Sequence, residues 1–179
     1  KQELAQQHHS DAMAYCLGKE PFIIGIDAKA GSMELRIMHA LTQREWQAVR
    51  HFRQHYFFNN LDVGDPYTWT FTHPDHVHFV LLKGTGIVGY AHLQMWPDSR
   101  AALRIIVIEE PYRRQGIGRQ FLAMCERWLQ HQNINSLHIQ SSAEAYRFYC
   151  LAGYRDMPFD DPDGYPGDAR DIDIGKLLS

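Results

Sequence analysis

Short runs of apolar, β-branched and aromatic residues recur along the chain with turn residues between them, and this pattern predicts a sheet of short strands. Turns at Gly84 and at Asp98-Ser99 favour an antiparallel meander of the second, third and fourth strands. The last two strands are expected to form a terminal hairpin around the loop 158–168. The expected strands cover residues 33–40, 76–83, 86–96, 101–108, 136–141, 154–157 and 169–174.

Three other segments carry apolar residues at helical spacing. Thr42 to Glu45 has the spacing of a capping box, so the first helix is expected to begin there. A second helix is expected over 119–132, and a third starts after Ser142 as its N-cap and ends at Gly153. Residues 57–75, between the first helix and the second strand, are aromatic and irregular. This order of elements indicates an α+β fold.

The composition bounds the class of protein. The chain has 179 residues, 45% of them hydrophobic, which is enough for a sizeable core. A formal net charge of -3 argues against a protein that holds nucleic acid by its overall charge. Neither a transmembrane run nor a signal peptide is recognisable, so we expect no membrane partner and a cytoplasmic location. Cys16, Cys125 and Cys150 are widely spaced and fit neither a disulfide framework nor a zinc pattern.

The segment after the strand-like run 103–108 has the composition of a phosphate-binding turn. Gly116 and Gly118 stand at the start of a helix, where backbone N–H groups can point at an anion, and arginines flank them. A formal G-x-G-x-x-G at 84–89 has strands on both sides and no following helix, so we interpret it as a hairpin turn. No Walker-type G-K-[S/T] occurs in the sequence.

The turn from Arg113 to Gly118 resembles the [Q/R]-x-x-G-x-[G/A] cofactor motif of the GNAT superfamily of acetyl-CoA-dependent N-acyltransferases. Further along, Ser142 to Tyr149 followed by Gly153-Tyr154 is similar to the closing motif A-x-x-F-Y-x-x-x-G-[FY] of the same superfamily. The resemblance extends over about residues 33–176. It implies a mixed, mostly antiparallel sheet flanked by helices, with the fourth and fifth strands splayed around the acyl-CoA site.

The resemblance also implies roles for particular residues. The fourth strand would bond the pantetheine arm, the turn would hold the pyrophosphate, and the first residue of the closing motif would contact the cofactor. The residues at these positions are Ile106, Val107, Ile108, Arg113, Arg114, Gln115, Gly116, Ile117, Gly118, Arg119 and Ser142. Tyr149 matches the tyrosine that often protonates the departing thiolate, although its position also suits a core tyrosine. Ser142 replaces the asparagine often found there and also suits an N-cap.

Acetylation of an amine needs a proton acceptor, because freeing an amine with a pKa of roughly 10 at neutral pH costs on the order of 4 kcal/mol. In the superfamily a glutamate on the fifth or fourth strand can serve, but these positions hold Leu137 and Ala102. Glu109, Glu110 and His138 lie near the expected cleft. They remain the candidates for a general base, directly or through water.

A histidine cluster raises the question of a metal site. His76 and His78 share one strand face, with His73 nearby, but a metal would need a further ligand such as Asp75 or His92. The sequence contains no recognised ligand motif, so we expect no metal. These histidines are interpreted as polar strand residues or as substrate-pocket side chains.

The segment 155–176 is rich in aspartate and poor in basic residues. Such runs are usually solvated loops. If the loop folds over the cleft, it favours a cationic acceptor such as a polyamine, an aminoglycoside or a lysine side chain.

Residues 1–32 are expected to form a helical extension ahead of an acetyltransferase domain at 33–179. The first thirty residues resemble the C-terminal end of a GrpB-type nucleotidyltransferase-like domain. This resemblance rests on Tyr15, Lys19, Phe22-Ile23 and Ile26. The extension is therefore either the remnant of a preceding domain or a segment that packs on the acetyltransferase domain.

Two classes of function remain open. The first is an N-acetyltransferase that moves an acetyl group from acetyl-CoA to an amine of a small molecule or a protein by direct attack. It would act as a monomer or homodimer, without nucleic acid. The second is a catalytically weak module that senses acyl-CoA for a larger two-domain protein. Thiol release with a panel of amines distinguishes the two.

Overall fold

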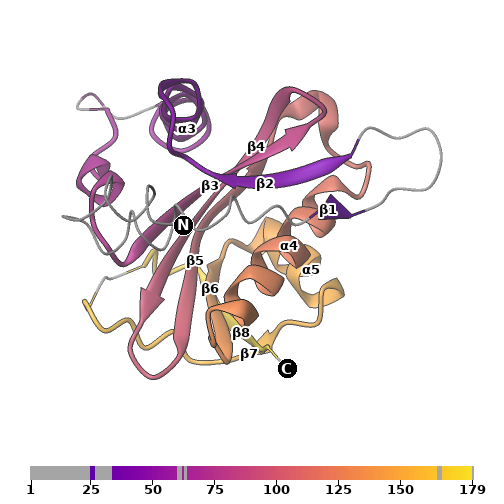
Figure 1. The fold of residues 1–179 in the computed structure, drawn as a ribbon. Helices are drawn as coiled ribbons and strands as arrows, with labels where there is room; N and C mark the ends of the chain where they lie inside the picture. The colour runs from indigo at the N-terminus through magenta and orange to yellow at the C-terminus, as the bar shows by residue number, and fades with distance from the viewer. Residues whose placement is uncertain (1–24, 27–33, 60–61, 63, 165–166, 179) are drawn as a thin grey trace, which may run out of the picture.

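A single eight-stranded sheet forms the centre of the computed structural model, which describes residues 25–26, 34–59, 62, 64–164 and 167–178. The strand order is β1-β2-β3-β4-β5-β6-β8-β7, as Figure 1 shows. Neighbouring strands are antiparallel except for the parallel pair β5 and β6. The predicted mixed, mostly antiparallel sheet is therefore confirmed. Its strands are β1 (Gly25–Ile26), β2 (Leu35–His39), β3 (His76–Lys83), β4 (Gly86–Trp96), β5 (Arg100–Ile108), β6 (Ser136–Ser141), β7 (Arg155–Asp156) and β8 (Ile172–Leu177).

Strands β3, β4 and β5 form the predicted meander. Lys83 pairs with Gly86 across the first turn, where Gly84 has a φ of 60°. At the second turn Asp98 and Ser99 have φ angles of 60° and 56°. Positive φ at both central residues is typical of a type I′ turn, whose twist matches that of the strands it joins. The glycine-rich segment 84–89 is thus a hairpin, as predicted.

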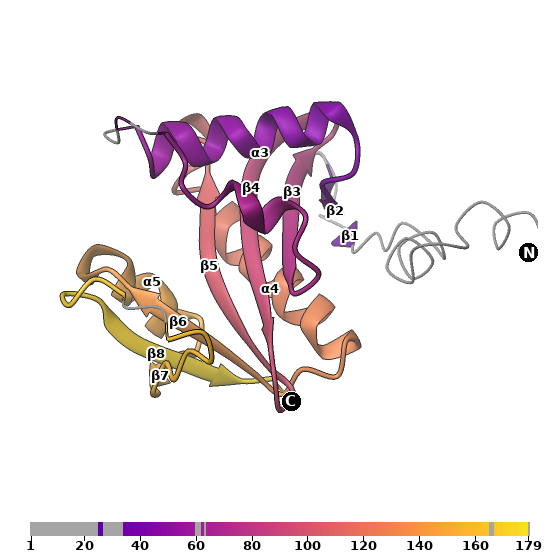
Figure 2. The same cartoon turned by 90° about the vertical axis from the view of Figure 1, so that its left-hand side faces the viewer.

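Helices cover both faces of the sheet, as Figure 2 shows for α3 and α4. Successive residues of β3 point to opposite faces, which explains two separate cores. Val80 and Leu82 pack with residues of α3, whereas Phe79 and Leu81 pack with residues of α4 and α5. The helices are α3 (Gln43–Tyr56), α4 (Ile117–His131) and α5 (Ala143–Leu151).

Helix α4 begins two residues before the predicted start at 119, because Gly116 is its N-cap, whereas α3 and α5 follow the predicted capping signals. The Glu45 carboxylate accepts a hydrogen bond of 2.8 Å from the backbone N–H of Thr42, at the start of α3. Ser142 Oγ accepts one of 3.3 Å from the N–H of Ala145 and caps α5. After α5, Gly153 takes a left-handed conformation with a φ of 95°, which suits glycine at a helix C-terminus.

The last strand differs from the prediction. A strand is expected from residue 169, whereas β8 begins at Ile172. The reason is a turn in which the Asp168 carboxylate accepts hydrogen bonds of 3.0 Å from the backbone N–H and from Nε of Arg170. Of the expected helical extension, only Gly25–Ile26 lies among the described residues, and it forms a short strand beside β2.

Two irregularities of β5 shape the candidate site. His92 pairs with Ile105 and Leu93 with Leu103, so Arg104 is the extra residue of a β-bulge. The parallel ladder to β6 covers only Arg100 to Ala102. Beyond it the two strands diverge in Figure 2, and the described residues supply no partner strand for that edge of β5.

Candidate functional site

The turn between β5 and α4 leaves a row of backbone N–H groups unused. After the 3₁₀ helix Glu110–Tyr112, the chain is left-handed at Arg114, with φ 60°, and at Gly116, with φ 77°. Gly116 is the N-cap of α4. Within the described residues, the N–H groups of 114–119 donate no backbone hydrogen bond. Together with the positive end of α4 they can hold an anion.

The three flanking arginines do not act alike. Arg113 donates a hydrogen bond of 2.8 Å from Nε to the carbonyl of Ile108 and lies over the Tyr56 ring, 5.0 Å from its centroid. Its guanidinium therefore stabilises the end of β5. Arg114 and Arg119 are exposed, and their side chains make no ion pair or hydrogen bond with the part of the chain that the structure describes. These two remain available to an anion.

The anion site adjoins the end of β5 and the helix α5. A Cβ placed on Gly118 would lie 3.7 Å from the Phe148 ring and 3.8 Å from Ile108. Tyr149, the next residue of α5, belongs to the same core cluster as Ile108 and Ile117. The fold thus brings the two sequence motifs that carry the family resemblance together with the end of β5.

Tyr149 is a largely buried tyrosine, with 7% of its surface exposed. Burial raises the pKa of its hydroxyl, so this group stays protonated at neutral pH. The described residues offer the hydroxyl no hydrogen-bond partner. Ser142 lies at the start of α5, where its hydroxyl is engaged in the cap. Both residues keep the positions that the sequence indicates, and their contacts with a cofactor stay predictions.

The candidate bases differ in their surroundings. Glu109 is half-buried directly after β5, and Glu110 is exposed with its carboxylate 3.9 Å from the Arg113 guanidinium. His138 is buried, and its Nε2 lies 2.9 Å from Ser136 Oγ while its Nδ1 lies 3.0 Å from the carbonyl of Pro158. Because both ring nitrogens already have partners, His138 anchors the C-terminal loop.

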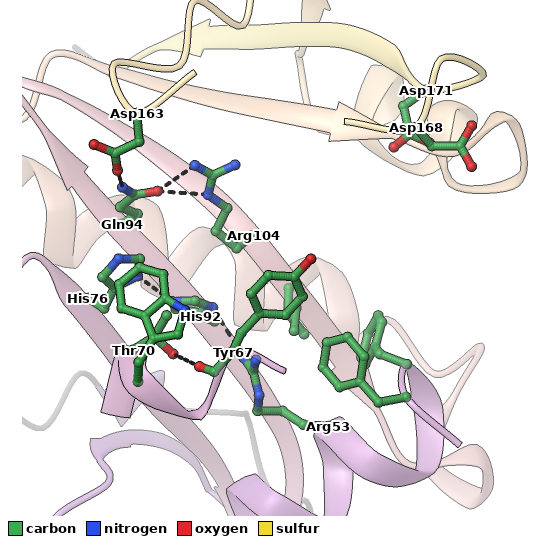
Figure 3. A pocket seen from close by; sticks show the side chains of 14 residues that line it. Arg53, Tyr67, Thr70, His76, His92, Gln94, Arg104, Asp163, Asp168 and Asp171 are labelled. Atoms are coloured by element: carbon green, nitrogen blue, oxygen red, sulfur yellow. Dashed lines mark hydrogen bonds between the residues drawn. The ribbon is translucent and has the colours of Figure 1, made fainter. Parts of the chain in front are cut away.

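A cavity of about 600 Å³ lies on the α3 face of the sheet, beside β5. Its size is typical of small-molecule sites. Figure 3 shows its polar side, formed by β3, β4 and β5. An aromatic wall faces it, composed of Phe57, Phe58, Tyr67 and Trp69. Among the catalytic and cofactor-binding candidates, none lines this cavity.

A buried hydrogen-bonded chain forms the floor of the cavity. Arg53, 1% exposed, donates from Nη2 to Asp65 at 3.0 Å and approaches His92 Nδ1 with Nη1 at 3.3 Å. His92 Nε2 lies 2.8 Å from Nδ1 of His76. Burial is the largest cause that lowers the pKa of His76, to about 4, and it also lowers the pKa of His92 well below its ordinary value. Both rings are therefore neutral at pH 7.

The acidic C-terminal loop does fold over the cavity. Asp163, Asp168 and Asp171 line it from above, as Figure 3 shows. Arg104, the bulge residue, forms an ion pair with Asp161, which is 4% exposed, and donates from Nε to Gln94 Oε1 at 2.8 Å. Gln94 Nε2 in turn donates to Asp163 at 2.7 Å. The bulge of β5 thus holds the loop in place.

Sequence reasoning missed Arg53, Gln94 and Arg104 as site residues. One signal was available for the arginines, because each interrupts an apolar pattern. Arg53 falls on the buried stripe of α3, and Arg104 lies within the apolar run of β5. A charged residue at such a position indicates a buried partner or a site.

Among the described residues, no group of three or more histidine, cysteine, aspartate or glutamate side chains is arranged to hold a metal ion. None of their helices is long and apolar enough to cross a membrane.

The chain was compared with known proteins and structures. No curated protein sequence matches it significantly. A candidate N-acetyltransferase from Lactobacillus plantarum is similar in structure, with a TM-score of 0.66 and 22% identity over 81% of this chain and 99% of that one. An acetyltransferase of the GNAT family from Staphylococcus aureus Mu50 has a TM-score of 0.63 and 17% identity, over 81% of this chain and 99% of that one. The ribosomal-protein-S18-alanine N-acetyltransferase from Escherichia coli has a TM-score of 0.60 and 23% identity, over 81% of this chain and 94% of that one.

These structural likenesses establish the fold. A family model described as the acetyltransferase (GNAT) family matches residues 38–154, which include the anion site at the start of α4 and the closing motif of α5. On this match, the chain belongs to the acetyltransferase (GNAT) family.

Proposed function

We propose that the protein transfers an acetyl group from acetyl-CoA to an amine. The observation that carries this proposal is the continuity of three features along β5. Arg104 and Ile105 line the cavity, Ile106 to Ile108 have one edge that no described strand pairs with, and the chain then enters the anion site of α4. A donor bound along this edge would reach the cavity at one end and the anion site at the other.

The residues of the site fit acetyl-CoA. Its pyrophosphate would accept hydrogen bonds from the N–H groups of 114–119, with Arg114 and Arg119 adding charge-assisted bonds. The amides of its pantetheine arm would pair, as an added strand does, with the edge of Ile106 to Ile108 that β6 does not occupy, where the Ile108 carbonyl already accepts from Arg113. Ser142 would border this site at the start of α5. When bound, acetyl-CoA supplies an acyl thioester and a thiol leaving group.

Tyr149 is our proposed general acid. It is kept protonated by burial and lies in the cluster that joins the end of β5 to the start of α4. A neutral hydroxyl there could donate its proton to the departing sulfur.

Glu109 is our preferred general base among the three candidates. It follows β5 directly and is half-buried, whereas His138 has both ring nitrogens occupied and Glu110 is paired with Arg113. Because Glu109 does not line the cavity, it would accept the proton through water.

The acceptor would be an organic cation. The loop presents Asp163 and Asp171 to the cavity, and the aromatic wall opposite can bind a cation through its ring faces. The two arginines of the cavity do not offset this charge, because Arg53 is paired with Asp65 and Arg104 with Asp161. The loop position thus favours the cationic acceptor that the sequence suggests.

Thiol release from acetyl-CoA, followed with a panel of cationic, neutral and anionic amines, tests this function. We expect turnover with the cationic members. Tight CoA binding with no thiol release across the panel would overturn the enzyme and favour the acyl-CoA sensor. Faster turnover of neutral aromatic amines than of cationic ones would overturn the acceptor class.

A further inference from the structure

The proton positions of His92 and His76, beside the cavity, are fixed by one arginine. A guanidinium only donates hydrogen bonds, so Arg53 Nη1, 3.3 Å from His92 Nδ1, makes that nitrogen the acceptor. The His92 ring is neutral, and its single proton must therefore sit on Nε2. From there it is donated to His76 Nδ1 at 2.8 Å.

The hydrogen bond from His92 fixes the proton of His76 in turn. His76 is neutral and accepts at Nδ1, so its own proton sits on Nε2. This Nε2 is buried and has no hydrogen-bond partner in the part of the chain that the structure describes. Buried donors are almost always satisfied, so a donor left open in a side chain that lines a cavity calls for a ligand.

A second branch from Arg53 agrees with this assignment. Arg53 Nη1 donates to the hydroxyl oxygen of Tyr90 at 3.1 Å, which leaves the Tyr90 hydroxyl to donate to His78 Nδ1 at 2.8 Å. The proton of neutral His78 is then on Nε2, 3.1 Å from the carbonyl oxygen of Thr70, which can only accept. Every contact in this branch has one donor and one acceptor.

We propose that the Nε2–H of His76, oriented by Arg53 through His92, is a subsite of the acceptor cavity that binds an uncharged oxygen of the amine substrate, a carbonyl or a hydroxyl. The inference rests on the proposed function and deepens it. His76 is a specificity-determining residue here, and Arg53 and His92 are positioning residues. A carboxylate oxygen is disfavoured because Asp163, Asp168 and Asp171 line the same cavity and would repel it.

Two aromatic rings cover the subsite. Trp69 and His73 each lie edge to face against His76, with ring centroids 5.1 Å away. Trp69 is 48% exposed, and the His73 side chain is 43% exposed. Because the Nε2 atom is buried, we expect an incoming ligand to displace one of these rings.

The first test locates the protons. In ¹⁵N-labelled protein without ligand, the histidine spectrum should give His76 and His92 with a protonated Nε2 and an unprotonated Nδ1. A proton on Nδ1 of His76 would overturn the proposal. In the double variant Arg53→Met/Asp65→Asn, which removes both charges of the ion pair, His92 and His76 should become mixtures of the two tautomers. Unchanged tautomers in a folded double variant would overturn the role of Arg53.

The second test measures affinity without acetyl-CoA, with L-phenylalanine amide and phenethylamine. Both carry a cationic amine and a phenyl ring, but only the first has a carbonyl. We expect the amide to bind about tenfold more tightly, since a site built to donate a hydrogen bond discriminates against an analogue without the acceptor. Equal affinities, or no binding of either amine, would overturn the substrate class.

Variants assign that preference to His76. His76→Phe should abolish it, His76→Gln should retain part of it through the amide N–H, and the exposed control His55→Phe should leave it unchanged. A preference that survives in His76→Phe would overturn the subsite even if the double variant Arg53→Met/Asp65→Asn does not fold. The outcomes are separable from those of acetyl transfer. Absent thiol release with an intact preference contradicts the enzyme alone, and turnover without the preference contradicts the subsite alone.

Discussion

Replacing Tyr149 by phenylalanine separates a catalytic tyrosine from a core tyrosine. The ring and its packing against Phe148 and Tyr154 are kept, and the described residues offer the hydroxyl no hydrogen bond to lose. A net intramolecular hydrogen bond contributes about 1 kcal/mol, so its absence predicts a change in unfolding free energy within about 0.5 kcal/mol. If the hydroxyl protonates the departing thiolate, kcat should fall by about tenfold to a thousandfold with acetyl-CoA affinity nearly unchanged.

Tyr154→Phe is the matched control. Tyr154 is fully buried in the same cluster and donates to Glu126 at 2.9 Å. Losing a bond to a charged group predicts a loss of about 1 to 3 kcal/mol in stability. The other carboxylate oxygen of Glu126 keeps its bond of 2.7 Å to Lys176, so the carboxylate stays partnered. Because this hydroxyl already has a partner in the core, we expect kcat to stay unchanged.

The two variants should therefore give opposite patterns. Urea unfolding supplies the free energies, and single-turnover kinetics with a competent amine supplies the chemical rate without product release. Tyr149→Phe should change the rate and leave stability alone, and Tyr154→Phe should do the reverse. A folded Tyr149→Phe protein with the wild-type single-turnover rate would refute the general-acid role.

Three further predictions concern the cofactor turn, the loop and pH. Gly118→Val should weaken acetyl-CoA binding, measured by calorimetry, by about tenfold to a thousandfold. Gly118→Ala, whose Cβ has only ordinary contacts, should bind within a few fold of the wild-type affinity. Equal binding by the two variants would contradict the site. Arg104→Met should release the loop and raise the acceptor KM about tenfold with the acetyl-CoA dissociation constant unchanged, and an unchanged KM would argue against the loop as part of the acceptor site. Burial is the main cause that lowers the pKa of His39 and of His76 from 6.5 to about 4. Between pH 4 and pH 6.5 the unfolded chain therefore binds more protons than the folded one, so stability should fall as the pH drops through this range. Urea midpoints should follow this course, with a shallower slope in His39→Phe; a flat profile would contradict it.

Local signals made much of the fold predictable. The capping box at Thr42, the positive-φ turn at Asp98-Ser99 and the C-terminal Gly153 each act within a few residues, so each could be read from neighbouring letters. The later start of β8 escaped prediction because it depends on the side chain of Asp168 bonding Arg170 instead of continuing a strand. Turn contacts of this kind compete with strand propensity.

Only the contiguous part of the candidate site could be proposed from the sequence. The turn from Arg113 to Arg119, which contains the anion site, is one continuous segment with a family motif, so its residues could be proposed as cofactor ligands from the sequence. The cavity instead unites Arg53 and His92 with Asp163, from three distant parts of the chain. The hydrogen bond between His92 and His76 also depends on the register of β3 against β4, which sets His78 opposite His92 and His76 opposite Gln94. Register follows from the whole sheet and not from any local pattern.

Titration of the ¹⁵N-labelled full chain with acetyl-CoA measures cofactor binding and its location together. We expect saturable binding in which the amide signals of Gly116, Ile117, Gly118 and Arg119 shift most, accompanied by those of Ile106 to Ile108. Absence of saturable binding, or shifts confined to residues away from β5 and the start of α4, would contradict it.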